Sequence, residues 1–223
     1  MKTVLLKQYA PPPIDKKEIL RYAGVKESSQ EMDALLESCL QEVCHSVSYG
    51  VCYREFPIIH EGDVLNLSFT KTSSKDLQKN LAGCKSIILF AATIGINIDR
   101  LTARYSRIEP ARGLMINAIG AERIESLVNA FNRDITKEKE AEGLFTVPRF
   151  SPGYGDLSLS LQRDIFSVLD CPRKIGLTLN DSLLMSPSKS VTAMIGVTDC
   201  QNKITSDGCS LCKKTDCTFR RNK

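Results

Sequence analysis

Apolar side chains recur at helical spacing in several stretches of the chain, and the longest predicted helix runs over residues 110–139. Small and apolar residues return there every three or four positions, which is the period of one helix face. The members of this face are Leu114, Ala118, Ala121, Ile124, Leu127, Val128, Phe131 and Ile135. Shorter helices are predicted over residues 15–24, 30–47, 73–81, 97–105 and 157–169.

Runs of apolar, β-branched and aromatic residues separate these helices and predict strands. Residues 84–93 form the clearest run and are typical of a central strand that is buried on both faces. Further strands are predicted over residues 47–59, 64–69, 174–179 and 190–197. Because helices and strands alternate without a regular βαβ rhythm, we predict an α+β fold with a largely antiparallel sheet.

Composition narrows the class of protein. The chain has 223 residues, of which 42% are hydrophobic and 25% charged, and this balance is typical of one globular domain. The basic excess is only 30 − 26 = 4, so we expect no nucleic-acid partner, which would need a concentrated basic face. Neither a membrane-spanning run nor the apolar stretch of a signal peptide is found, so we expect no membrane partner and a cytoplasmic location.

Nine cysteines divide into two groups. The scattered ones are expected to be buried thiols, and they are Cys39, Cys44, Cys52, Cys84 and Cys171. The others crowd the end of the chain, and they are Cys200, Cys209, Cys212 and Cys217. In a reducing compartment such closely spaced thiolates favour a zinc or an iron–sulfur site over disulfides. The alternative is an oxidation-prone tail without metal.

These patterns divide the chain into a main domain and a tail. The main domain is predicted over residues 1–198, with an N-terminal arm over residues 1–13 that ends in three prolines. The Cys-rich tail is predicted over residues 199–223.

A Gly/Pro loop over residues 149–156 carries the most informative chemistry. Arg149 offers a planar fork of donors that suits a carboxylate. Tyr154 offers a ring face for a cation and a hydroxyl for a hydrogen bond. Gly153 and Gly155 let the backbone approach a ligand closely. A small molecule with a carboxylate, an ammonium and a sulfonium would use all of these groups, whereas the alternative is an ordinary tight turn.

The loop and its neighbours resemble the activation domain of vitamin B12-dependent methionine synthase in its free-standing form. The signature of this family for S-adenosylmethionine, Arg-x-x-x-Gly-Tyr, matches Arg149, Gly153 and Tyr154. Residues 179–191 resemble the family segment Leu-Thr-Glu-Ser-x-x-Met-x-Pro-x-x-Ser-Val, and Ile14-Asp15 resembles its N-terminal Ile-Asp. The resemblance extends over nearly the whole chain to about residue 198.

The resemblance implies a twisted antiparallel sheet with flanking helices and a shallow groove that binds S-adenosylmethionine. The residues that it implies as ligand contacts are Asp15, Glu125, Arg149, Phe150, Gly153, Tyr154 and Gly155. In this interpretation Arg149 pairs with the methionyl carboxylate, and Asp15 or Glu125 takes the ammonium. From the residues alone, Asp15 is also typical of a helix cap, with Glu18 reaching back to its amide.

The resemblance also implies that the chain acts in complex with another protein. An activation domain presents S-adenosylmethionine to the cobalamin of a B12-dependent methionine synthase, or of another corrinoid protein, while a flavodoxin- or ferredoxin-like donor supplies an electron. No catalytic residue is expected, because the sulfonium is already activated and the protein only positions it. Two alternatives are a free-standing methyltransferase with a small substrate and a metal-bearing adaptor whose tail is the functional part.

Overall fold

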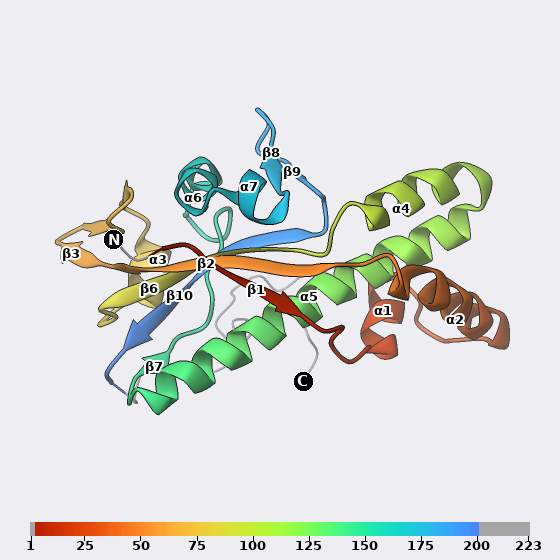
Figure 1. The fold of residues 1–223 in the computed structure, drawn as a ribbon, viewed down its shortest axis with the longest axis horizontal. Helices are drawn as coiled ribbons and strands as arrows, with labels where there is room; N and C mark the ends of the chain where they lie inside the picture. The colour runs from red at the N-terminus through yellow and green to blue at the C-terminus, as the bar shows by residue number, and fades with distance from the viewer. Residues whose placement is uncertain (1–2, 201–223) are drawn as a thin grey trace.

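A five-stranded antiparallel sheet forms the centre of the computed structural model, which describes residues 3–200. Its strands, in spatial order, are β1 (Leu5–Tyr9), β2 (Tyr49–Pro57), β6 (Ser86–Thr93), β10 (Ser190–Thr198) and β7 (Phe145–Thr146). Every neighbouring pair in this sheet is antiparallel. With helices on its flanks (Figure 1), the sheet confirms the predicted α+β fold.

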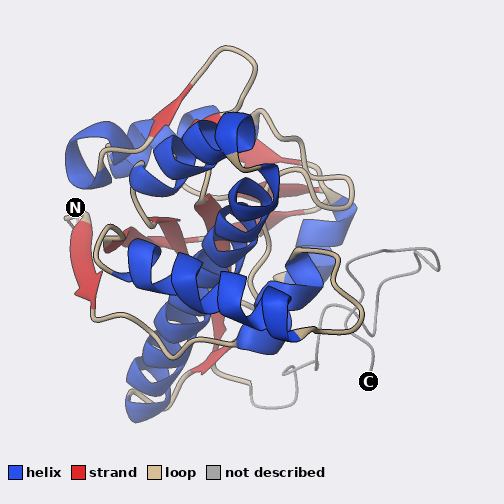
Figure 2. Cartoon of the chain, turned by 90° about the vertical axis from the view of Figure 1, so that its right-hand side faces the viewer, coloured by secondary structure: helices blue, strands red, loops and turns tan. Residues whose placement is uncertain are grey.

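The longest helix runs obliquely past the strands on one face of the sheet, and three shorter helices pack against it (Figure 1). These helices are α1 (Lys16–Tyr22), α2 (Gln30–Cys44), α4 (Asn97–Ile108) and α5 (Pro110–Ala141). The remaining elements are smaller, and they are α3 (Lys75–Asn80), α6 (Leu161–Leu169), α7 (Cys171–Ile175), β3 (Ile59–Glu61), β4 (Val64–Asn66), β5 (Lys71–Thr72), β8 (Thr178–Leu179) and β9 (Met185–Ser186). The turned view in Figure 2 shows helices around the central strands, while the strand next to the N-terminus lies at the edge.

Strand β6 is buried on both faces, as its continuous apolar run predicts. Its alternate residues Ile88 and Phe90 belong to the hydrophobic cluster under α5, whereas Ile87 and Leu89 belong to the cluster under α6. Phe131 of α5 packs its ring 4.8 Å from that of Phe90, measured between centroids. Two separate apolar clusters therefore hold helices on opposite faces of one sheet.

Several boundaries differ from the prediction. Residues 174–175, expected in a strand, end helix α7, and only Thr178–Leu179 is extended. Gly176 explains the change, because its φ of +65° ends the helix in the left-handed conformation. The segment 157–160, expected to be helical, is a loop before α6. Strand β1 lies within the predicted N-terminal arm, where the apolar run was too short to indicate a strand.

The cysteine prediction holds for most of the scattered thiols. Among residues 3–200, Cys39, Cys52, Cys84 and Cys171 are buried. Cys44 is exposed, so its prediction was wrong. It is the last residue of α2, where its thiol donates to the carbonyl of Gln41 at 3.3 Å. No described helix is both long enough and apolar enough to cross a bilayer.

Candidate functional site

A polar stripe along helix α5 brings together segments that are far apart in the sequence. Glu122, Glu125, Ser126 and Asn129 follow the spacing of three and four residues that places side chains on one helix face. Asp15, just after the N-terminal arm, meets this stripe at Glu122, and the loop after β7 meets it at Glu125 and Asn129. The two meeting points are about one helical turn apart, roughly 5 Å along the axis.

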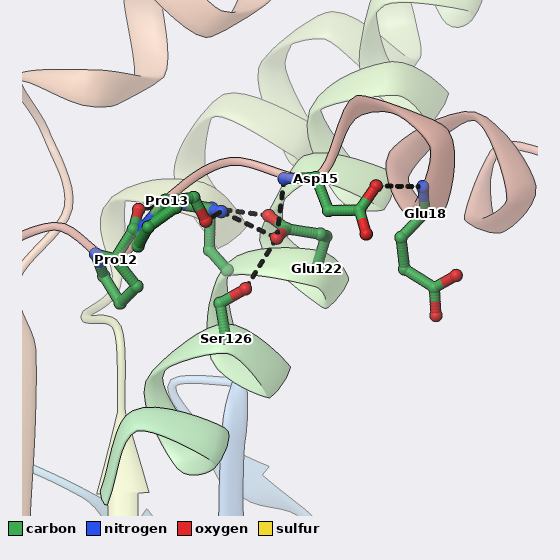
Figure 3. A network of polar contacts seen from close by, with 7 residues as sticks. Pro12, Pro13, Asp15, Glu18, Glu122 and Ser126 are labelled. Atoms are coloured by element: carbon green, nitrogen blue, oxygen red, sulfur yellow. Dashed lines mark hydrogen bonds and ion pairs between the residues drawn. The ribbon is translucent and has the colours of Figure 1, made fainter. Parts of the chain in front are cut away.

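At the first meeting point, a buried ion pair holds the arm. Arg123 donates to the carbonyl of Pro12 at 2.6 Å and to that of Pro13 at 2.7 Å. Glu122, which is 2% exposed, accepts from Arg123, from the hydroxyl of Ser126 at 2.6 Å and from the amide of Asp15 at 3.2 Å (Figure 3). The last residue of the arm is thus bonded directly to α5.

Asp15 caps helix α1, as predicted. Its Oδ1 accepts from the amide of Glu18 at 3.0 Å (Figure 3). The reciprocal bond of a capping box was predicted wrongly, because the Asp15 amide donates to Glu122 and the Glu18 carboxylate pairs with Arg21 at 2.7 Å instead. Asp15 is exposed, and among the described residues its second oxygen has no hydrogen-bond donor. One carboxylate oxygen therefore remains available to a ligand.

At the second meeting point, Arg149 lies against two residues of α5. Its Nη2 donates to Oε2 of Glu125 at 2.8 Å, and its Nη1 donates to Oδ1 of Asn129 at 3.0 Å. The side chains of Arg149 and Glu125 are 27% and 33% exposed, so the pair is open to solvent on one side. The two predicted ligand contacts are therefore brought together. Asn129 was not predicted, although it follows Glu125 by four residues on the same face.

The loop between Arg149 and helix α6 is anchored at both ends. The amide and the carbonyl of Phe150 exchange hydrogen bonds of 2.9 Å with Met194 on β10. Its ring packs against the hydrophobic cluster under α6. Gly153 and Gly155 take φ values of +87° and +55°, and Tyr154 between them is 69% exposed. The bonds of Phe150 to β10 thus fix the start of the loop, which exposes the Tyr154 ring and the backbone of the two glycines.

Asp156 holds the far end of this loop, a role that the sequence did not indicate. Its carboxylate accepts from the hydroxyl of Ser74 and from the amides of Lys75 at 2.7 Å and Asp76 at 3.2 Å. These amides open helix α3, where they have no partner within the helix. The bond from Ser74 and those from the amides lower the pKa of Asp156 below its usual value. The loop is thereby fixed to α3.

Gly155 lets the loop pass close to α3. A Cβ there would lie 2.4 Å from Oδ2 of Asp76, at a φ of +55°. We expect Gly155→Ala to lower the free energy of unfolding by about 1–2 kcal/mol or more in urea titrations. Gly62→Ala is the control, because its φ is +61° but no heavy atom lies within 4 Å. Equal losses in the two variants would contradict a role for the contact with Asp76.

The predicted metal site lies mostly outside the described residues. Of its four cysteines, Cys209, Cys212 and Cys217 fall there, and Cys200 is the last residue described. Cys200 is exposed and follows Asp199, which pairs with Lys85. Within residues 3–200, no three His, Cys, Asp or Glu side chains gather as a metal site would require. The metal site stays a prediction.

Comparisons with known proteins cover most of the chain. The sequence matches the family described as "Vitamin B12 dependent methionine synthase, activation domain" over residues 70–204, which is more than half of its length. Among solved structures 13 chains match, including the MetH reactivation domain bound to AdoHcy, with a TM-score of 0.61. That match has 14% sequence identity and covers 87% of this chain and 78% of the other, so it supports the fold. No curated protein matches the sequence.

Proposed function

Because the chain belongs to the family of vitamin B12 dependent methionine synthase activation domains, we propose that it binds S-adenosylmethionine and supports reductive remethylation of cob(II)alamin in a separate corrinoid protein. The partner is a B12-dependent methionine synthase or a related corrinoid protein. The observation that carries this proposal is the partly exposed Arg149–Glu125 pair, about one helical turn along α5 from Glu122, which binds the amide of Asp15. The AdoHcy held by the matching reactivation domain supports the class of ligand.

The charges at the stripe fit the amino-acid end of S-adenosylmethionine. This end is a zwitterion, with a carboxylate that suits the Arg149 guanidinium and an ammonium that suits a carboxylate. The ligand carboxylate replaces Glu125 at Nη2 of Arg149, and the ammonium binds the released Glu125 or Asp15. Each protein charge keeps an opposite partner during this exchange, so none is left buried and unpaired. Asn129 holds Nη1 of Arg149 and preserves the orientation of its fork.

The loop completes the proposed groove. The exposed Tyr154 ring suits the sulfonium, because an aromatic face attracts a cation. The backbone at Gly153 and Gly155 lines the groove without side chains in the way. Phe150 contributes through its position, since its bonds to Met194 place Arg149 and the loop relative to β10.

In the proposed reaction S-adenosylmethionine and the corrinoid are both substrates. One electron from a flavodoxin- or ferredoxin-like protein reduces Co(II) to Co(I). The electron pair of Co(I) takes the methyl group, the pair of the broken C–S bond stays on sulfur, and S-adenosylhomocysteine leaves. Since the sulfonium is already activated, the chain supplies no general acid or base. Its residues bind and orient, which is sufficient for a large rate effect when two reactants must meet.

A reconstitution experiment tests this function. The purified chain is mixed with cob(II)alamin-loaded methionine synthase, S-adenosylmethionine and a reductant, and methylcobalamin is followed by its absorption spectrum. We expect methylcobalamin to form only when the chain and S-adenosylmethionine are both present. Equal formation without the chain would contradict the proposal. Consumption of S-adenosylmethionine with a small substrate in the absence of cobalamin would favour a free-standing methyltransferase instead.

For the tail, we propose that Cys200 joins Cys209, Cys212 and Cys217 in a metal site. The exposed position of Cys200, two residues after the end of β10, supports this, because its thiol is not buried in the main domain. Metal analysis after anaerobic purification is expected to find about one zinc per chain, or iron with labile sulfide. Cys212→Ser should lower the metal content, whereas Cys44→Ser should not. Metal-free wild-type protein would contradict the site and also the metal-bearing adaptor.

A further inference from the structure

The proline-rich end of the arm needs hydrogen bonds from outside itself. Three consecutive prolines have no amide hydrogens, so this segment cannot make backbone donor bonds of its own. The carbonyls of Pro12 and Pro13 instead accept from the two ends of the Arg123 guanidinium, at 2.6 and 2.7 Å. A planar fork suits two neighbouring acceptors in this way, and a single ammonium does not.

Apolar side chains do not fill all of the space beneath the proline-rich end of the arm. A cavity of about 50 Å³ remains beneath it, between the arm and helices α2 and α5. Its lining includes Pro11, Pro12, Ile14, Leu40, Val43 and Ile119. The pocket is partly open to solvent, so apolar contacts do not fill the space beneath this segment. Pairing of β1 with β2 holds the start of the arm, and the polar bonds to Glu122 and Arg123 fix its proline-rich end and Asp15.

Glu122 cannot contact a ligand directly. It is 2% exposed, and its two oxygens accept from Arg123, Ser126 and the amide of Asp15 (Figure 3). Burying two charges side by side is costly, and an apolar pair of similar size would often be as stable. Stability alone therefore does not account for this ion pair. The bond from the Asp15 amide to Glu122 indicates instead that the pair fixes the position of Asp15.

We propose that Glu122 and Arg123 are positioning residues, which hold the arm so that the free oxygen of Asp15 faces the ammonium of the bound ligand. This inference rests on the proposed function. The bond from the Asp15 amide to Glu122 sets the backbone, and the bond from the Glu18 amide to Oδ1 sets the side chain. Together they direct the remaining oxygen of Asp15 from a defined place beside α5.

A double-mutant cycle on ligand affinity tests this inference. Arg123→Lys keeps the charge beside Glu122 but removes the fork that spans both carbonyls. Asp15→Asn keeps the cap of α1, because asparagine is an equally good capping residue, but removes the charge that meets the ammonium. We expect each change to weaken S-adenosylhomocysteine binding about tenfold by calorimetry. In the Asp15→Asn background, Arg123→Lys should cause no further loss.

The matched control is Arg112→Lys. Arg112 lies on the same helix and its fork binds Glu109 and Ser38, away from the arm. We expect its substitution to leave the affinity unchanged. Should Arg123→Lys fold poorly, Ser126→Ala removes one donor from Glu122 and should shift the amide resonance of Asp15 in ¹⁵N spectra, with a smaller loss of affinity.

Each outcome supports or overturns the positioning role. Equal losses from Arg123→Lys in both backgrounds, or no loss in either, would overturn it. An unchanged affinity in Asp15→Asn, with a large loss in Arg149→Ala, would overturn it and leave the proposed function standing. If the wild-type chain does not bind S-adenosylhomocysteine at all, the proposed function itself fails. In that case, an Asp15 amide resonance that does not shift in Ser126→Ala would still contradict the proposed link between Glu122 and the arm.

Discussion

Replacing Arg149 by alanine is expected to weaken the binding of S-adenosylmethionine at least tenfold. The reason is the loss of a charge-assisted bond between the guanidinium and the ligand carboxylate, and such bonds are about twice as strong as neutral ones. The variant also leaves Glu125 without its present partner and Asn129 without the donor at 3.0 Å. Isothermal titration calorimetry with S-adenosylmethionine and with S-adenosylhomocysteine measures the effect.

An arginine elsewhere on the surface provides the control for this measurement. Arg133 is exposed on helix α5, two turns beyond Glu125, so Arg133→Ala removes the same charge from the same helix. Its affinity should equal that of the wild type at moderate salt, where distant surface charges are screened. Equal affinities in Arg149→Ala and Arg133→Ala would remove Arg149 from the site.

The second large effect concerns stability. Arg123→Met is expected to lower the free energy of unfolding by about 3–5 kcal/mol, because it leaves a buried carboxylate without its partner. Glu122 is 2% exposed and Arg123 is 3% exposed, so water cannot solvate the unpaired Glu122 carboxylate unless the arm moves. The carbonyls of Pro12 and Pro13 lose their donors in the same variant. Urea titrations followed by circular dichroism measure the change.

Two further variants test the cause of this loss of stability. The double variant Glu122→Leu, Arg123→Met removes both charges and should recover much of the stability, as replacement of whole buried ion pairs does elsewhere. Lys16→Met breaks an exposed ion pair with Glu37 and should leave stability nearly unchanged. A small loss in Arg123→Met, comparable to that of Lys16→Met, would show that the pair contributes little to holding the arm.

The elements that were predicted correctly are those with a strong local signal. Helix α5 has a periodic apolar face over many turns, and strand β6 has a continuous apolar run. Both signals arise within one segment and need no knowledge of its neighbours. Strand β1 and helix α7 were missed because each is only five residues long, and the partner β2 or the left-handed Gly176 determines their structure.

The candidate site divides in the same way. The spacing of Arg149, Gly153 and Tyr154 is a property of one short loop, so it was visible in the sequence. The contact of Arg149 with Glu125 joins residues 24 positions apart, and that of Asp15 with Glu122 joins residues 107 apart. The bonds of Asp156 to α3 are equally remote, at about 80 positions. None of these pairs has a spacing that a helix or a turn would produce.

Local patterns thus established the fold class, the long helix and the chemistry of the loop, because backbone preference and amphipathic period act over a few residues at a time. Packing of the arm and the loop against α5 determined how the residues of the candidate site are arranged. It buried Glu122 and Arg123, paired Arg149 with Glu125, and bonded the amide of Asp15 to Glu122. Such contacts depend on which surfaces meet when helix and sheet bury their apolar faces together. The sequence around a charged residue does not indicate which distant residue it will contact.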